Sequence, residues 1–126
     1  MNKDIALPRP IARYLQAVNT GDVDGFPSSF AEDAVVEDVQ RKIRGLAAIK
    51  EWSRHDIFGV EARLDVVKVF ERDGRTVLTI KIDGTFDRTG LPDPLLMDHA
   101  FKVVDGKVVE LKVTFATDHP GRAGAA

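Results

Sequence analysis

The sequence predicts an α+β protein in which N-terminal helices cover one face of a curved, antiparallel or mixed β-sheet. Two observations predict this class: apolar residues follow helical spacing in much of the N-terminal half, and long alternating strands follow from Ala62 onward. Helices that precede such a sheet must bury their apolar stripes against it. We therefore expect a two-layer, single-domain chain of 126 residues, with a loose N-terminal extension at 1–7 and a loose tail at 117–126.

The N-terminal half contains three predicted helices. The first covers PRPIARYLQAVNTGD, because Pro10 suits a first helical turn and Gly21 suits a helix end. A short second helix through VDGFPSSF follows Asp22, a suitable cap, and Pro27 limits its length. The third helix, LAAIKEWSRHDI, begins after Gly45.

Strands are predicted between and after these helices. The segment AVVEDV alternates so that Val36 and Asp38 share a face, and RKIRG is expected to return beside it. Asp73-Gly74 and Asp105-Gly106 are two-residue hairpin signals, and DRTGLPDP is a longer connection. The C-terminal half is therefore expected to form a meander.

The strand PLLMDHAFKVV contains two ionisable neighbours, Asp98 and His99, and only one of them can easily face the interior. A two-residue turn at Asp105-Gly106 would send Asp98 inward together with a lysine. A bulged three-residue loop would pair Val103 with Lys107 and send His99 inward on a far more apolar face. Because the core must be covered by apolar side chains, we expect the bulged hairpin, with His99 inside and Asp98 outside.

The last strand is expected to have one covered face and one mixed outer face. The covered face comprises Val109, Leu111, Val113 and Phe115. The outer face comprises Val108, Glu110, Lys112 and Thr114, and Val77 and Thr79 add moderately apolar area beside it. We predict a homodimer formed through this outer face.

Composition excludes several function classes. Eighteen basic and twenty acidic residues give a net charge of −2 without a basic run, which disfavours a nucleic-acid partner. The absence of cysteine excludes disulfides, thiol catalysis and thiolate metal sites, and three scattered histidines, including His55 and His119, are a weak metal signal. No apolar run approaches the roughly 20 residues of a membrane helix, and no signal peptide is evident. We expect a cytoplasmic protein with neither a membrane nor a cofactor as partner.

Three segments carry a resemblance to a known family: ARYLQAVNTGDVDGF, FAEDAVVEDV and GLAAIKEW. The chain resembles the nuclear transport factor 2-like superfamily, in its SnoaL-like and ketosteroid-isomerase-like branch, from about Pro10 to Phe115. The resemblance implies a cone, in which the curved sheet wraps around the helices and encloses an apolar pocket. It also implies a dimer. Ser53 stands where bacterial steroid isomerases have a second tyrosine.

The resemblance also implies site residues. Tyr14 stands at the position of the isomerase tyrosine and Asp38 at the position of the catalytic base, while His99 or Asp98 would supply a further donor. Trp52 and other apolar residues are expected to line the pocket. These pocket-lining residues are Val18, Phe30, Trp52, Phe86, Met97, Phe101, Leu111, Val113 and Phe115.

These residues suit proton transfer next to the carbonyl of a small apolar ligand. Such chemistry needs a base near the carbon and hydrogen-bond donors near the oxygen, and the resemblance to ketosteroid isomerase implies these roles for Asp38 and Tyr14. An inward His99 would give activity a histidine-like pH dependence. A dehydratase or polyketide cyclase could use the same groups, and an epoxide hydrolase would need an Asp-Arg-Asp set, for which the sequence shows no convincing match. A non-catalytic ligand-binding or dimerisation module of the same fold stays open.

Overall fold

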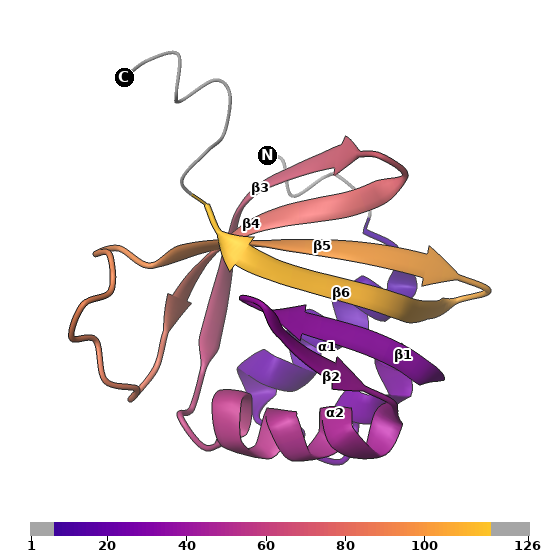
Figure 1. Ribbon diagram of the computed structural model, residues 1–126, viewed down its shortest axis with the longest axis horizontal. Coiled ribbons are helices and arrows are strands. Elements are labelled where there is room, and N and C mark those ends of the chain that lie inside the picture. The colour runs from indigo at the N-terminus through magenta and orange to yellow at the C-terminus, as the bar shows by residue number, and fades with distance from the viewer. Residues whose placement is uncertain (1–6, 117–126) are drawn as a thin grey trace.

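The computed structural model describes residues 7–116, which form one six-stranded sheet with two α-helices packed on one side of it (Figure 1). The α+β class predicted from the sequence is confirmed. The tail, with His119, and most of the predicted N-terminal extension lie outside the described residues. In chain order the elements are α1 (Arg9–Thr20), the 3₁₀ turn η2 (Phe26–Ser29), β1 (Phe30–Asp38), β2 (Arg41–Arg44), α2 (Leu46–Ser53), the π-helical turn η3 (Arg54–Phe58), β3 (Arg63–Arg72), β4 (Arg75–Asp83), β5 (Leu96–Val104) and β6 (Lys107–Phe115).

The sheet is mixed, with the strand order β2-β1-β6-β5-β4-β3. Strands β3 to β6 form the predicted antiparallel meander, and β1 pairs with β6 in parallel. This parallel pairing puts Asp38, the last residue of β1, opposite Val113 of β6. Two segments far apart in the sequence thereby become neighbouring strands inside the sheet.

The helices begin and end for local reasons that the sequence displays. Helix α1 stops at Gly21, whose φ of 73° is readily adopted by glycine, and it buries Ile11, Tyr14 and Val18 against the sheet. The predicted second helix is only the four-residue turn η2. There the Gly25 N–H donates to the Asp22 carboxylate at 3.0 Å, so the aspartate closes a tight turn instead of capping a longer helix.

The hairpin between β5 and β6 differs from both registers considered from the sequence. Its turn has two residues, with Val104 opposite Lys107, so the expected pairing of Val103 with Lys107 is wrong. A bulge lies one step further along, because Val103 pairs with Val108 and Lys102 with Glu110. The extra residue in β6 restores the apolar face that the bulged loop was expected to provide, and His99 pairs with Val113.

The bulge also changes the faces assigned to the start of β6. The sequence predicts Val108 on the outer face, but this residue is fully buried and belongs to the hydrophobic core. Val109, predicted inside, is the unpaired bulge residue and is only half-buried. Beyond the bulge, Leu111 and Val113 face the core as expected.

Within residues 7–116, the helices are all too short or too polar to cross a membrane.

The bulge generates a stability prediction. Val108→Ala removes fully buried methyl groups and should lower the free energy of unfolding by about 2 kcal/mol. Val109→Ala, at the half-buried bulge position, should lower it by less than about 1 kcal/mol. Urea unfolding monitored by tryptophan fluorescence measures both values. Equal losses, or a larger loss for Val109, would contradict the observed register.

Candidate functional site

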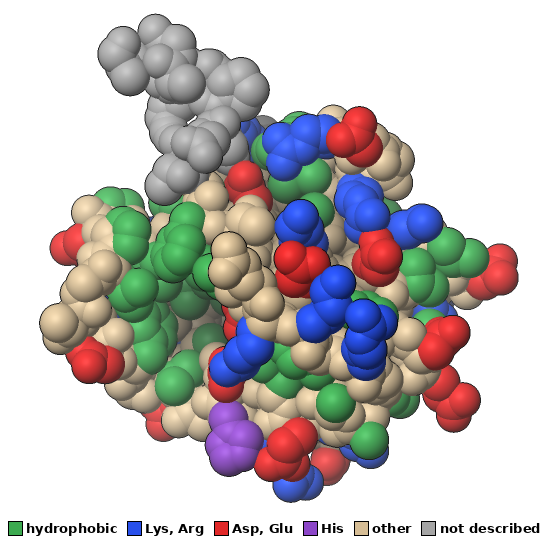
Figure 2. Space-filling view, in the orientation of Figure 1, with side chains coloured by type: hydrophobic (Ala, Val, Ile, Leu, Met, Phe, Trp, Pro, Cys, Tyr) green, Lys and Arg blue, Asp and Glu red, His purple; other side chains and the backbone are tan. Residues whose placement is uncertain are grey.

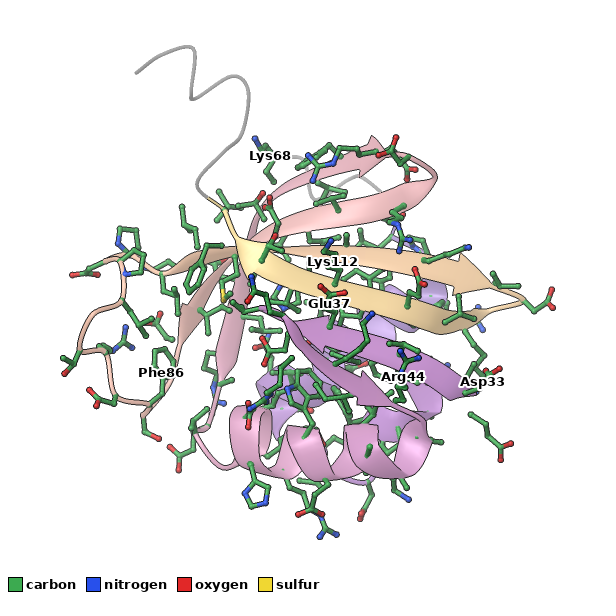
Figure 3. All side chains as sticks on the ribbon, viewed as in Figure 1. Asp33, Glu37, Arg44, Lys68, Phe86 and Lys112 are labelled. Atoms are coloured by element: carbon green, nitrogen blue, oxygen red, sulfur yellow. The ribbon has the colours of Figure 1, made fainter. Side chains whose placement is uncertain are left out.

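A cavity of about 450 Å³ lies between the helices and the inner face of the sheet. Its walls come from α1, the end of β1, α2 with η3, and strands β3 to β6. The segment 84–95, which joins β4 to β5, closes one side with Phe86 and Leu91. In Figure 2 hydrophobic side chains gather around a hollow beside this segment, and Figure 3 labels Phe86 on it.

Most of the lining is apolar, and the structure brings most of the predicted pocket residues to it. Of these, Val18, Trp52, Phe86, Met97, Val113 and Phe115 line the cavity. By contrast, Phe30, Phe101 and Leu111 lie in the packed core and are not among its lining residues. Residues not singled out from the sequence complete the wall: Val39, Ile57, Val60, Ala62, Leu64, Ile82, Leu91 and Leu95.

Tyr14 lies at the inner end of the cavity. It is 1% exposed, and its ring packs edge-on against Phe101 at 5.3 Å between centroids and against His99 at 6.2 Å. Burial raises the pKa of Tyr14 above its ordinary value, and the negative charge of Asp38 raises it further. The phenol is therefore a neutral hydrogen-bond donor at physiological pH.

His99 faces the same inner end, from β5. It is 4% exposed, and its Nδ1 is buried without a hydrogen-bond partner among the described residues. Burial lowers the pKa of His99 to about 4, and the polar backbone of Met97 and the nearby charge of Asp98 only partly offset this. The imidazole is therefore neutral near pH 7, and the histidine-like titration of activity expected from the sequence is not supported.

Asp38 lines the cavity closer to solvent, with 23% of its side chain exposed. The Trp52 Nε1–H donates a hydrogen bond to Asp38 Oδ2 at 3.1 Å. Arg41 Nη2 lies 3.6 Å from the same oxygen. Both contacts engage Oδ2, so the described residues place no donor on Oδ1.

The mouth of the cavity carries a second carboxylate, Asp56, on the π-helical turn η3. Arg41 hydrogen-bonds Asp56 and approaches Asp38, so the three form an Asp-Arg-Asp cluster that the sequence did not reveal. Arg41 follows the β1–β2 turn, and Asp56 lies fifteen residues later at the end of a helix. This spacing matches no sequence motif, so the sequence does not predict the contact. His55, also at the mouth, contacts Glu51 at 3.0 Å.

Asp98 and Ser53 lie away from the cavity lining. Asp98 is buried on the outer face, where it accepts a hydrogen bond from the Thr79 hydroxyl at 2.7 Å. Ser53 donates to the Lys50 carbonyl within its own helix at 2.8 Å. Of the four residues expected to be catalytic, the structure thus brings together Tyr14, Asp38 and His99.

Comparison with known proteins identifies the family of this chain. Residues 11–111 match the model of the SnoaL-like domain. The chain belongs to the SnoaL-like family. This SnoaL-like chain is also similar to solved structures that are less than 25% identical to it, and these likenesses bear on the fold.

Three structures illustrate the likeness. A candidate polyketide cyclase from Sinorhizobium meliloti has a TM-score of 0.75 at 24% identity, with 86% of this chain and 95% of that chain covered. The Δ5-3-ketosteroid isomerase from Mycobacterium sp. has a TM-score of 0.71 at 20% identity, with 87% and 92% covered. A Mycobacterium tuberculosis protein in complex with estradiol-17beta-hemisuccinate has a TM-score of 0.73 at 14% identity, with 87% and 93% covered.

The low pKa of His99 generates a prediction on stability. The folded pKa of about 4 lies below the ordinary value of 6.5, so the unfolded chain binds the proton more readily between these values. The free energy of unfolding should therefore fall as the pH drops from 7 to 4, with His99 contributing about 3 kcal/mol of that loss. In His99→Leu the fall should be smaller by that amount. Urea unfolding of both proteins at pH 7, 5.5 and 4 measures it, and parallel curves would contradict the neutral, buried histidine.

Proposed function

We propose that this SnoaL-like protein is an enzyme that transfers a proton next to the carbonyl of a small apolar ligand. Asp38 acts as the base, and Tyr14 donates a hydrogen bond to the oxygen on which negative charge develops. The observation that carries the proposal is the convergence of Asp38, Tyr14 and His99 on one largely apolar cavity. A volume of about 450 Å³ suits a ligand of drug or steroid size.

The contacts of Asp38 support its role as a base. Trp52 and Arg41 hold Oδ2, so the carboxylate is oriented while Oδ1 stays available to take a proton. Held in this way, the base needs little reorganisation to reach its reactive position.

The electrostatic link between Asp38 and Tyr14 supports the role of the tyrosine. In the resting state the carboxylate charge raises the pKa of Tyr14. Once Asp38 accepts a proton, that charge is lost and a new one appears on the ligand oxygen, so the phenol O–H becomes a stronger donor when it is needed. A neutral His99 completes the inner end, where its imidazole ring lines the cavity beside the position proposed for the ligand oxygen.

One observation favours a second candidate function. The cluster of Asp38, Arg41 and Asp56 has the composition that an epoxide hydrolase needs, with one carboxylate to activate water and another to protonate the epoxide oxygen. We rank it second because the Arg41 side chain is 57% exposed and is not among the lining residues of the cavity. A dehydratase or polyketide cyclase would use the same first step as the leading proposal. A non-catalytic binding protein would need the cavity but not the base.

Replacement of Asp38 tests the catalytic proposal. Asp38→Asn keeps the shape and removes the base, so turnover of a Δ5-3-ketosteroid should fall by at least about a hundredfold. Ligand binding should change much less, because the cavity walls stay in place. Absorbance of the conjugated product measures turnover, and isothermal titration with the same ketone measures binding.

Two control variants make the result specific. Asp33→Asn, an exposed position on the same strand, should behave like the wild-type protein. Asp56→Asn should leave ketone turnover within about threefold, whereas an epoxide hydrolase would lose its activity. Survival of ketone turnover within about tenfold in Asp38→Asn would remove Asp38 as the base.

We also propose a homodimer through the outer face of the sheet, with a different chemistry from the one expected. Val77 and Thr79 are only 1% and 4% exposed, and Val108 faces the core, so these residues offer a partner almost no apolar area. Charged side chains such as Lys68 and Lys112 cover this face instead (Figure 3). A dimer here would depend on ion pairs between the two copies.

Salt dependence tests this dimer. Since exposed ion pairs weaken as salt screens them, we expect a dimer mass at micromolar concentration in low salt and a larger monomer fraction at about 1 M NaCl. Light scattering after size exclusion measures both. A monomer mass at low salt would refute the dimer, and a salt-insensitive dimer would refute its ionic basis.

A further inference from the structure

Val39, the residue after Asp38, has a backbone conformation that its side chain disfavours. Its φ is 48°, in the left-handed region that β-branched residues rarely adopt, and Gln40 follows with a φ of 77°. These two residues form the turn between β1 and β2, where Asp38 pairs with Arg41. The backbone is held in place, since the Val39 N–H donates to the Val113 carbonyl at 3.0 Å.

The other two hairpins of the chain show what such a turn ordinarily contains. The β3–β4 and β5–β6 turns also have two residues at positive φ, and both are Asp-Gly. Those residue types suit left-handed turns, whereas valine costs free energy there. The β1–β2 turn therefore departs from the pattern of the chain itself. Strain of this kind persists where it serves a site.

The position of the Val39 side chain suggests a role in ligand binding. Val39 lines the cavity and is 39% exposed, and Phe115, also on the lining, is 37% exposed. Tyr14 and His99 at the opposite end are only 1% and 4% exposed. The cavity thus runs from a buried end with Tyr14 and His99 to an open rim, where Val39 and Phe115 supply apolar area beside the polar residues of the mouth.

We propose that Val39 is a specificity-determining residue that contacts the apolar outer end of an elongated ligand. The ligand class is a ketone with an extended hydrocarbon part: its oxygen lies at Tyr14 and His99, and its far end reaches the rim. The placement of the oxygen rests on the proposed function, but the contact at Val39 is a binding property and does not need turnover. Asn or Gly at position 39 would relax the turn and lose this contact.

A series of ligands of increasing length tests the proposal. We choose 4-alkylcyclohexanones, from methyl to hexyl, with binding measured by isothermal titration. The wild-type affinity should rise by about threefold to fourfold per methylene until the chain reaches the rim. In Val39→Asn the shortest ketones should bind as before, and the longest should bind about fivefold more weakly. Val39→Gly is the second replacement, in case asparagine disturbs folding.

Gln40→Gly is the matched control, because it relaxes the same turn at an exposed position that does not line the cavity. It should follow the wild-type affinity at every length. Both Val39→Asn and Gln40→Gly should raise the melting temperature by about 3 °C. The proposal is wrong if wild-type affinity is independent of length, or if Val39→Asn weakens all lengths equally or none. A lower melting temperature for Val39→Asn would overturn the strain argument. Loss of the Asp38 role leaves these outcomes unchanged, so the two proposals fail separately.

Discussion

The parallel pairing of β1 with β6 is the constraint on which the candidate site depends. It brings the end of β1 to the middle of the inner wall, where Asp38 lies opposite Val113 and the Val39 N–H bonds the Val113 carbonyl. Asp38 comes from the helical half of the chain, and His99, which pairs with Val113 on the other side, comes from the meander. Without this one pairing, the carboxylate and the imidazole would not face the same space.

Burial then divides the ionisable groups of the cavity into two kinds. Tyr14 and His99 lie at the inner end, and desolvation holds both in their neutral forms by raising one pKa and lowering the other. Asp38 and Asp56 lie nearer the mouth, where Trp52 and Arg41 supply donors. The cavity therefore has neutral hydrogen-bonding groups at its inner end and carboxylates nearer its mouth.

Residue patterns predict the fold and part of the site because both depend on which faces must be apolar. One face of the predicted strand is far more apolar than the other, and His99 belongs to that face. In the structure His99 lines the cavity, as this reasoning predicts. The turn that produces this face is not predicted, because a bulge inside β6 and a bulge in the loop bury similar sets of residues. The contacts of Arg41 with Asp38 and Asp56 cannot be predicted from the sequence, for a different reason. They depend on where a turn and a helix end lie in space, and a single sequence carries no record of that distance.

The π-helical turn η3 has a consequence for how the entrance can change. A regular α-helix presents residues three or four apart to one side. The wider turn at Arg54–Phe58 instead gives the cavity three consecutive residues, His55, Asp56 and Ile57. Insertion or removal of one residue in this turn would change which side chains face the opening. Tyr14 on α1 and His99 on β5 would stay in place. The entrance and the neutral inner end are thus carried by separate elements, so the entrance can vary by a single residue without rebuilding the inner end.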